Sequence, residues 1–346
     1  MNEAARTRDA AGGAAAEADA IGAIGAIGAV GAIGAAGAAG SAVGAVAAGA
    51  VQAPVVPGAS APLLAVAHLS KAFGGLRAVH DVGFQLHAGE MLALIGPNGA
   101  GKTTCFNMVN GQLKPDAGSV LLAGTELVGK RPDAIWRLGV GRTFQIAETF
   151  ASLTVLENVQ LALLSHAGRV LRAWCAARSQ FRDEALGLLT QVGMQAQAER
   201  AMSVLAYGDI KRVELAMALA NKPRLLLMDE PTAGMGPAER NELMALTRAL
   251  AREHGIGVLF TEHSMDVVFA HADRLIVLAR GELIAEGAPA TVRDDPQVRQ
   301  VYFGMGSTFA LPSAKPGPAG APPHAGLAPE SGAAVPAAGM GAPRHA

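Results

Sequence analysis

The hydrophobic residues in the middle of the chain fall into short, nearly continuous runs. Four of these runs lie at Met91–Ile95, Arg224–Asp229, Gly257–Thr261 and Arg274–Leu278. Each run is too short for a typical helix, and the last three are separated by segments that are compatible with helices. Strands buried on both faces have this continuous apolar character. The pattern therefore predicts an α/β fold with a mainly parallel sheet that is covered on both faces.

Shorter extended segments around the first run have the spacing of antiparallel strands. Leu64–Leu69 and Val82–Leu86 flank the turn residues Phe73-Gly-Gly75, and a turn at Lys114–Gly118 leads into Ser119–Leu122. Extended segments joined by Gly-containing turns are typical of hairpins. We therefore expect an N-terminal antiparallel β subdomain beside the parallel sheet.

Helical spacing dominates the region from residue 153 to residue 197, which has no convincing strand pattern. Arg182–Val192 places Leu186, Leu189 and Val192 on one face, as an amphipathic helix does. We predict an all-helical insert at about residues 150–210, a short helix at Pro132–Arg137 and a longer one at Ala238–Glu253.

Both ends of the chain are low-complexity sequence. No charged residue occurs from Ala20 to Val51, where Ile-Gly-Ala repeats, and beyond residue 307 the chain is rich in Ala, Gly and Pro. Such segments have too few large apolar residues to build a core. We predict disordered extensions at 1–61 and 307–346 and a folded domain at 62–306.

The uncharged N-terminal tract has other interpretations. It is long enough to span a bilayer, but Gly and Ala supply little transfer energy, so a span is less favoured than a disordered or surface-associated, weakly helical segment. A signal peptide also fits poorly, because acidic residues are mixed with the early arginines. These residues are Glu3, Asp9, Glu17 and Asp19, with Arg6 and Arg8.

Charge and cysteine content narrow the classes of function. The chain has 28 Lys and Arg against 29 Asp and Glu, which implies no strong attraction to nucleic acid. Its two cysteines, Cys105 and Cys175, suggest neither a disulfide framework nor a metal cluster. We expect Cys105 to be a small buried residue and the setting to be reducing.

A complete phosphate-binding loop follows the first apolar run. Gly96–Thr104 reads Gly-Pro-Asn-Gly-Ala-Gly-Lys-Thr-Thr, between a predicted strand and a predicted helix that begins at Lys102. Its glycines allow backbone N–H groups to approach phosphate oxygens, and the helix N-terminus adds a positive dipole end. Lys102 is expected at the β- and γ-phosphates and Thr103 at Mg²⁺. The residues expected to bind ATP here are Gly96, Pro97, Asn98, Gly99, Ala100, Gly101, Lys102, Thr103 and Thr104.

Acidic residues follow a later strand at the point where hydrolysis needs them. Asp229 ends an apolar run and is expected to hold Mg²⁺, and Glu230 follows as the general base or water-positioning group. His263, after the next strand, is placed to donate to the γ-phosphate. A P-loop NTPase is therefore predicted.

These residues carry a resemblance to the ATP-binding cassette (ABC) family, which covers nearly all of residues 62–306. Gln145 resembles the glutamine of the Q-loop, which touches Mg²⁺ and senses the membrane subunit. Residues 233–236 lie at the D-loop, His263 matches the switch histidine, and Phe73 resembles the aromatic residue that stacks on adenine. The implied metal ligands are Thr103, Gln145 and Asp229. The segment that resembles the family signature, which would bind ATP of a second subunit in trans, comprises Leu205, Ala206, Tyr207, Gly208 and Asp209.

Within the family the chain most resembles the importers of branched-chain amino acids. Four stretches carry this: Lys71–Gly75, Gly141–Gln145, Leu205–Gly208 and Val301–Gly304. The resemblance implies a second ATPase subunit, two transmembrane permease subunits and an external solute-binding protein. It also implies a location at the cytoplasmic face of the inner membrane.

Three positions depart from the general family pattern. Ala206 replaces a serine, Asp209 a glutamine and Gly236 an aspartate, which puts the hydrolysis rate and the strength of the closed dimer in doubt. Other solutes, namely amides, urea or aromatic acids, stay open, as does export of lipid or lipopolysaccharide. A soluble ATPase that acts on DNA or ribosomes without a transporter is the alternative from another class.

Overall fold

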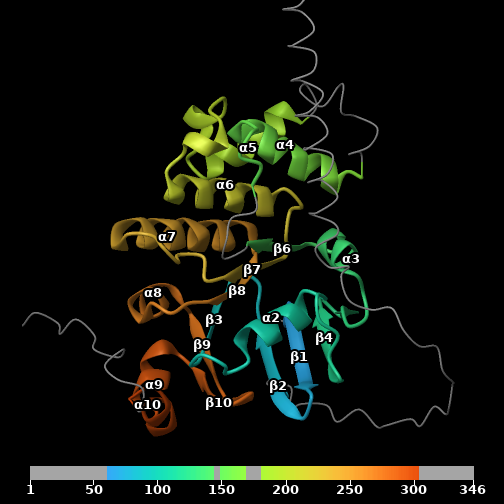
Figure 1. The fold of residues 1–346 in the computed structure, drawn as a ribbon, viewed down its shortest axis with the longest axis vertical. Coiled ribbons are helices and arrows are strands. Elements are labelled where there is room, and N and C mark those ends of the chain that lie inside the picture. The colour runs from blue at the N-terminus through green and yellow to red at the C-terminus, as the bar shows by residue number, and fades with distance from the viewer. Residues whose placement is uncertain (1–60, 144–148, 169–180, 304–346) are drawn as a thin grey trace, which may run out of the picture. The chain divides into compact units, whose positions relative to one another are not determined.

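The computed structural model describes residues 61–143, 149–168 and 181–303. Predictions for residues 1–60, for Gln145 and for the tail beyond residue 303 lie outside these ranges. The described part confirms the predicted fold class, with a mainly parallel sheet, an antiparallel sheet and a group of helices between β6 and β7 (Figure 1).

Six strands form the larger sheet, in the order β10-β9-β3-β8-β7-β6. Neighbours from β9 to β6 are parallel, and only β10 pairs antiparallel, with β9. These strands are β3 (Met91–Ile95), β6 (Val140–Thr143), β7 (Leu225–Asp229), β8 (Gly257–Thr261), β9 (Arg274–Ala279) and β10 (Glu282–Gly287).

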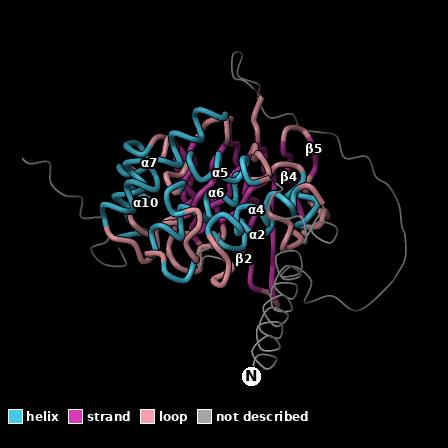
Figure 2. The backbone as a smooth tube through the Cα atoms, turned by 90° about the horizontal axis from the view of Figure 1, so that it is seen from above, coloured by secondary structure: helices cyan, strands magenta, loops and turns pink. Residues whose placement is uncertain are grey.

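The continuous apolar runs serve two cores at once, because successive side chains of a strand point to opposite faces. In β3, Leu92 and Leu94 join one hydrophobic cluster, whereas Met91, Ala93 and Ile95 join the other. The first cluster includes buried residues of α2 (Lys102–Val109) and of the antiparallel sheet. The second includes buried residues of the helices that follow β6 in the chain. Figure 2 shows the strands with helices around them.

The antiparallel sheet has the order β2-β1-β4-β5. Its strands are β1 (Leu64–Phe73), β2 (Leu76–Leu86), β4 (Ala117–Leu122) and β5 (Thr125–Glu126). The hairpin is as predicted, but β1 runs on to Phe73 rather than ending at Leu69. The register of β1 against β2 shifts at three points between Val66 and Ala72, so the simple alternation of apolar and polar residues is broken there.

Helices in the region of the predicted insert pack into the same core as the helices on the large sheet. Helix α4 starts with a capping box, in which the side chains of Thr154 and Glu157 each bond the other's backbone N–H. Helix α6 starts within the predicted insert and continues to Leu219. The helices are α4 (Val155–His166), α5 (Arg182–Gln191), α6 (Tyr207–Leu219), α7 (Pro237–His254), α8 (Met265–His271), α9 (Pro289–Asp294) and α10 (Pro296–Phe303), with α3 (Pro132–Arg137) beside β6 and short 3₁₀ turns η2 (Gln195–Gln197) and η3 (Met202–Val204).

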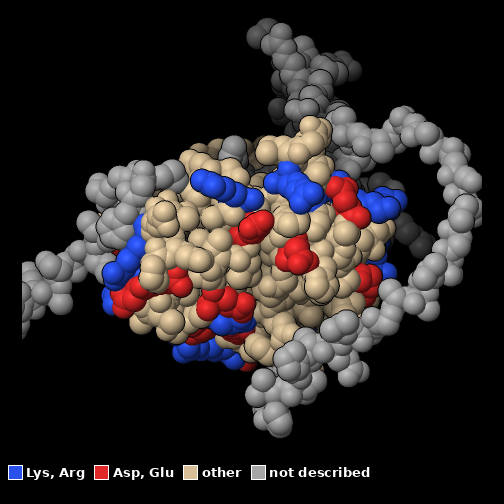
Figure 3. Space-filling model, turned by 90° about the horizontal axis from the view of Figure 1, so that it is seen from below, with Lys and Arg blue, Asp and Glu red and all other residues tan. Residues whose placement is uncertain are grey.

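Charges of both signs are interspersed on the face of the molecule shown in Figure 3. Among the described residues, no helix combines the length and the apolar character that a bilayer crossing requires.

Candidate functional site

The phosphate-binding loop connects the end of β3 to the start of α2, as predicted. Gly96 and Gly101 both have positive φ, and a Cβ at either would meet a backbone oxygen, Leu278 O at 2.3 Å and Ala78 O at 2.4 Å. Only glycine fits both the conformation and the space. Helix α2 begins after Gly101 without a side-chain cap, which leaves the N–H groups of its first turn for an anion.

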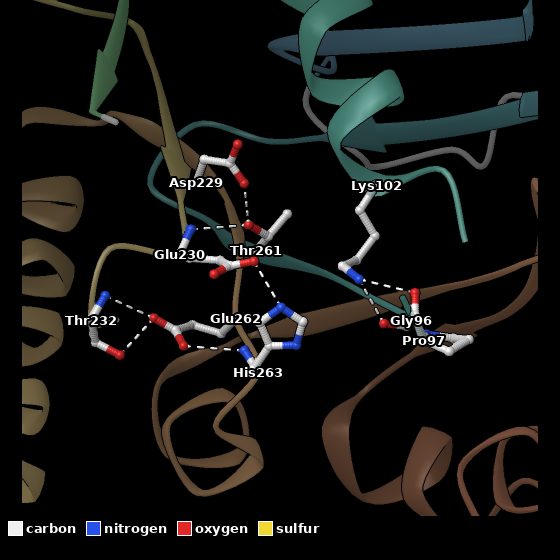
Figure 4. A network of polar contacts seen from close by, with 9 residues as sticks. All are labelled: Gly96, Pro97, Lys102, Asp229, Glu230, Thr232, Thr261, Glu262 and His263. Atoms are coloured by element: carbon white, nitrogen blue, oxygen red, sulfur yellow. Dashed lines mark hydrogen bonds and ion pairs between the residues drawn. The ribbon is translucent and has the colours of Figure 1, made fainter. Parts of the chain in front are cut away.

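Lys102 extends from the first turn of α2 back over the loop. Its ammonium donates to the carbonyl oxygens of Gly96, at 2.7 Å, and Pro97, at 3.1 Å, and the residue is 8% exposed (Figure 4). Burial lowers the pKa of Lys102, and the negative charges of Glu230 and Asp229 oppose that shift. Lys102 faces the same region as Asp229 and Glu230 (Figure 4).

Asp229 and Glu230 stand at the carboxyl end of β7 and are joined through Thr261 on β8. The Glu230 N–H donates to the Thr261 hydroxyl at 3.0 Å, and this hydroxyl donates to Asp229 Oδ1 at 2.7 Å. Asp229 and Thr261 are direct neighbours in the sheet. Sequence reasoning missed Thr261, since only the pairing of β7 with β8 brings it to Asp229.

His263 and Glu230 meet at the same edge of the sheet. His263 Nε2 lies 2.7 Å from Glu230 Oε1, and the Glu230 side chain is 22% exposed against 53% for His263 (Figure 4). Glu230 has a φ of 48°, an uncommon left-handed conformation for a residue with a side chain. The turn it makes directs the carboxylate to the histidine instead of continuing the strand.

Glu262 is a second residue that the sequence analysis missed. It is 4% exposed, and its carboxylate accepts from the N–H and the hydroxyl of Thr232, at 3.0 and 2.6 Å, and from the N–H of His263 at 3.2 Å. A buried carboxylate with this many donors fixes the loop after Glu230 to the loop that carries His263. A single glutamate at a strand end gives no sequence signal of such a role.

Arg142 on β6 completes the charged surroundings of Asp229. Its Nη2 lies 3.8 Å from Asp229 Oδ2 and donates to Asn107 Oδ1, and its Nη1 donates to Asn107 Oδ1 and Gln112 Oε1. The sequence pointed to Arg142 only as a member of the stretch Gly141–Gln145, with no role of its own. Gln145 of that motif lies outside the described residues.

Phe73 stands at the tip of the β1–β2 hairpin and is 48% exposed. The Lys71 ammonium lies 5.7 Å from its ring centroid and also donates to Asp116 at 2.7 Å. The N–H of Ala72 donates to the same carboxylate. These bonds lower the pKa of Asp116, first through Lys71 and then through Ala72, and they hold the strand end so that the open face of Phe73 is available for a flat ligand.

The signature-like segment starts helix α6, which belongs to the cluster opposite that of α2. Ala206 is its N-cap residue and has no hydroxyl, so α6 begins without a side-chain cap. Ala206 and Tyr207 are exposed, Leu205 and Asp209 are partly exposed, and Gly208 is buried. The start of α6 therefore has no side-chain cap and lies largely at the surface.

The side chains of Thr103 and Asp229 carry oxygen atoms that could bind a metal ion beside a nucleotide. Thr103 is exposed at the start of α2, and Asp229 is partly buried at the end of β7. Hydroxyl and carboxylate oxygens are ligands that Mg²⁺ prefers, with phosphate and water completing its shell. Among the described residues, no cluster of three or more His, Cys, Asp or Glu residues is arranged as a metal cage. The Thr103 hydroxyl and the Asp229 carboxylate are thus oxygen donors of the kind that fits Mg²⁺ beside a phosphate.

Comparison with known proteins identifies the family of the chain. The family model described as "ABC transporter" matches residues 79–233, and that described as "Branched-chain amino acid ATP-binding cassette transporter" matches residues 282–304. LivG of Escherichia coli strain K12, a high-affinity branched-chain amino acid transport ATP-binding protein, is 39% identical over 71% of this chain and 99% of its own length. BraF of Pseudomonas aeruginosa, which carries the same description, is 37% identical over the same shares.

Solved structures agree with these relatives. A nucleotide-free ATP-binding cassette from an ABC transporter superposes with a TM-score of 0.64 and 29% identity, covering 70% of this chain and 99% of that one. The ADP conformation of an ABC transporter cassette gives 0.63 and 29%, covering 71% and 100%. The chain therefore belongs to the ABC transporter family and is the ATP-binding, ATP-hydrolysing subunit of a transporter.

Proposed function

We propose that this chain powers the uptake of branched-chain or other amino acids, as the ATPase subunit of an importer. Three matches support the solute class. LivG and BraF are named for branched-chain amino acid transport, and the C-terminal residues 282–304 match a family model of the same description. The structural observation that carries the hydrolytic role is that Lys102, Asp229, Glu230 and His263 come together at one edge of the sheet (Figure 4).

In this proposal each residue has a distinct task. The loop from Gly96 to Thr104 and the Lys102 ammonium bind the β- and γ-phosphates of ATP, and the ring of Phe73 stacks on adenine. Glu230 accepts a proton from the attacking water or orients that water. His263 holds the Glu230 carboxylate and donates to the γ-phosphate.

The residues proposed to hold Mg²⁺ are Thr103, Gln145 and Asp229. When bound, the ion neutralises charge on the phosphate oxygens. Thr261 contributes by fixing the orientation of the Asp229 carboxylate through the 2.7 Å bond that its hydroxyl donates.

We further propose that two copies, or one copy and a similar subunit, associate head to tail. The segment from Leu205 to Asp209 then binds the nucleotide held by the partner's loop, and ATP joins the two subunits. Hydrolysis reopens the pair, because a γ-phosphate bound between the subunits favours the closed state. The pair works with two membrane permease subunits at the cytoplasmic face and receives solute from an external binding protein.

A Glu230→Gln variant tests the hydrolytic role. We expect kcat to fall by about 10²- to 10⁴-fold, the usual contribution of a general base, with ATP affinity nearly unchanged. Glu242→Gln is the matched control, because Glu242 is an exposed carboxylate on α7 that pairs with Arg212. Near-normal steady-state hydrolysis by the Glu230 variant would remove Glu230 from the mechanism.

The solute class is tested with the complete transporter. The chain is reconstituted in liposomes with the permease subunits and the binding protein of its transporter, and ATP hydrolysis is measured with leucine, urea or an aromatic acid. Stimulation by leucine supports the proposal. Stimulation by urea or the aromatic acid alone, with no response to leucine, refutes the amino acid assignment.

A further inference from the structure

Arg240 on α7 joins two loops that are far apart in sequence. Its Nε donates to the carbonyl oxygen of Met235 at 3.0 Å, and its Nη1 donates to the Ser264 hydroxyl at 2.6 Å. Met235 lies in the segment Ala233–Gly236, which we call the D-loop segment, and Ser264 follows His263 directly. One partly buried guanidinium thus connects the D-loop segment to the residue next to the switch histidine.

The hydroxyl of Ser264 is used in an unusual way. Ser264 is the N-cap residue of α8, and a serine there normally accepts a bond from an N–H of the first helical turn. In this structure Ser264 makes no such cap, and its oxygen accepts from Arg240 instead. The position of the start of α8, and with it the position of His263, is therefore tied to α7 rather than fixed only locally.

The other end of this connection reaches the signature-like segment. A Cβ built on Gly208 would lie 3.6 Å from Met235 Cε, and one built on Gly234 would lie 3.6 Å from Tyr207 Cε1. Glu239, the neighbour of Arg240 in sequence, accepts from the Gly236 N–H at 3.2 Å. The D-loop segment therefore packs directly on the first turn of α6.

We propose that Arg240 is a positioning residue that makes the D-loop segment and the His263 segment move as one unit. A displacement of the signature-like segment, when it binds the partner's nucleotide, is then passed through Met235, Arg240 and Ser264 to His263 and on to Glu230. This proposal rests on the proposed ATPase function. Gly236 has no side chain and cannot connect the D-loop segment to the His263 segment, so the proposal assigns that connection to Arg240.

The test compares Arg240→Ala with the wild-type chain in steady-state ATP hydrolysis. We expect kcat to fall about 5- to 20-fold, within the usual range of coupling between sites, while the KM for ATP stays within about twofold. The Hill coefficient for ATP is expected to fall towards 1. Arg240→Lys keeps the charge but cannot reach both acceptors as a fork, so it should restore only part of the rate.

Arg248→Ala is the matched control. Arg248 lies on the same helix and donates to the Ala270 carbonyl, at 3.4 Å, and to Asp273, at 2.9 Å, so it holds the far end of α8. Ser264→Ala removes the acceptor alone and gives a second route to the same loss if Arg240→Ala folds poorly, as judged by thermal unfolding.

The proposal is overturned if Arg240→Ala keeps the wild-type kcat and Hill coefficient, or if Arg248→Ala changes both to the same extent. When Arg240→Ala does not fold, a wild-type Hill coefficient for Ser264→Ala overturns it instead. A wild-type chain without ATPase activity would contradict the proposed function itself, which keeps the two failures distinguishable.

Discussion

Two regions of the molecule differ in how firmly contacts within the chain hold them. The first is the phosphate-binding loop with the carboxylates beside it, and the second is the signature-like segment. Lys102, Asp229 and Glu230 are buried or partly buried and are held by short bonds to neighbouring strands and loops. The segment from Leu205 to Asp209 starts a helix without a side-chain cap and exposes Ala206 and Tyr207. The first region is held in place within the chain, whereas the second is an exposed surface that, in the proposed pair, a partner subunit completes.

This difference also explains where the sequence departs from its family pattern. Ala206, Asp209 and Gly236 all lie on the signature-like segment or on the D-loop segment that packs against it. The loop at Gly96 and Gly101 cannot accept a Cβ without meeting backbone oxygens, so it has little freedom to vary. Ala206 and Gly236 are exposed and Asp209 is partly exposed, so packing restricts these positions less than it restricts the loop.

The largest expected effect concerns Cys105, which lies on α2 directly behind the loop. Burial raises the pKa of its thiol from 9.0 to about 12, so at pH 8 the reactive thiolate is depleted about 1,000-fold. In a Cys175→Ser background, modification of the native protein by iodoacetamide should be slower than modification of the urea-unfolded chain by at least that factor. Native and unfolded rates within tenfold of each other would show that the loop region opens readily.

Lys102→Ala should produce the next largest change. Removal of the ammonium from the loop is expected to weaken ATP binding by about 100-fold, the scale of one charge-assisted contact to phosphate. Isothermal titration calorimetry measures this directly. Lys222→Ala is the control, because Lys222 is an exposed lysine that pairs with Glu184 away from the loop. Equal ATP affinities for the wild-type chain and the Lys102 variant would contradict the assignment of Lys102 and its loop to the ATP site.

Thr261→Val tests the bond network that the sequence did not reveal. The variant keeps the shape of a buried side chain but removes the hydroxyl and both of its bonds, to the Glu230 N–H and to Asp229. We expect kcat to fall by about tenfold, which corresponds to a net loss of about 1.4 kcal/mol. Thr247→Val is the control, since Thr247 is also buried but bonds only its own helix. A Thr261 variant with the wild-type kcat would show that the link between the Glu230 backbone N–H and the Asp229 carboxylate is not needed.

Asp209→Gln should have a smaller effect, confined to the partner-facing side. In the proposed pair Asp209 lies beside the partner's nucleotide, so loss of this partly exposed carboxylate is expected to raise kcat by about two- to fivefold, a change typical of exposed charges. ATP binding to the single chain should not change. Asp183→Asn, in the first turn of α5, is the control. An unchanged kcat for Asp209→Gln would place Asp209 away from the partner's nucleotide.

Asp116→Asn should give the smallest change. The pKa of Asp116 is lowered in the folded state. The stability that its charged carboxylate gives to the end of β1 is therefore fully present at neutral pH and is lost as the pH falls below 3.8, the ordinary pKa of this group. At pH 7 the variant should weaken ATP binding by about twofold, because Asp116 is exposed. Asp81→Asn, which removes an exposed carboxylate from the adjacent strand, should have no effect. A change larger than tenfold would mean that the Phe73 hairpin contributes more than a stacking surface.

The sequence predicted the elements that depend on local pattern and missed those that depend on pairing. The strand limits of β8 and the start of α2 follow from apolar runs and loop glycines, and both were predicted correctly. The extension of β1 to Phe73 was missed because register shifts disturb the alternation of residues. Thr261, Glu262 and Arg240 were missed because their partners come from other strands and loops, and no local spacing records those contacts.

The most direct test of a composite site is the mass of the Glu230→Gln variant with and without ATP, measured by size-exclusion chromatography with light scattering. With ATP and Mg²⁺, the account predicts a shift from one chain to two, because ATP that is bound but not hydrolysed holds the two half-sites together. With ADP the variant should remain a single chain. A single chain at saturating ATP would contradict the composite site, and a dimer of equal stability without nucleotide would show that ATP does not join the subunits.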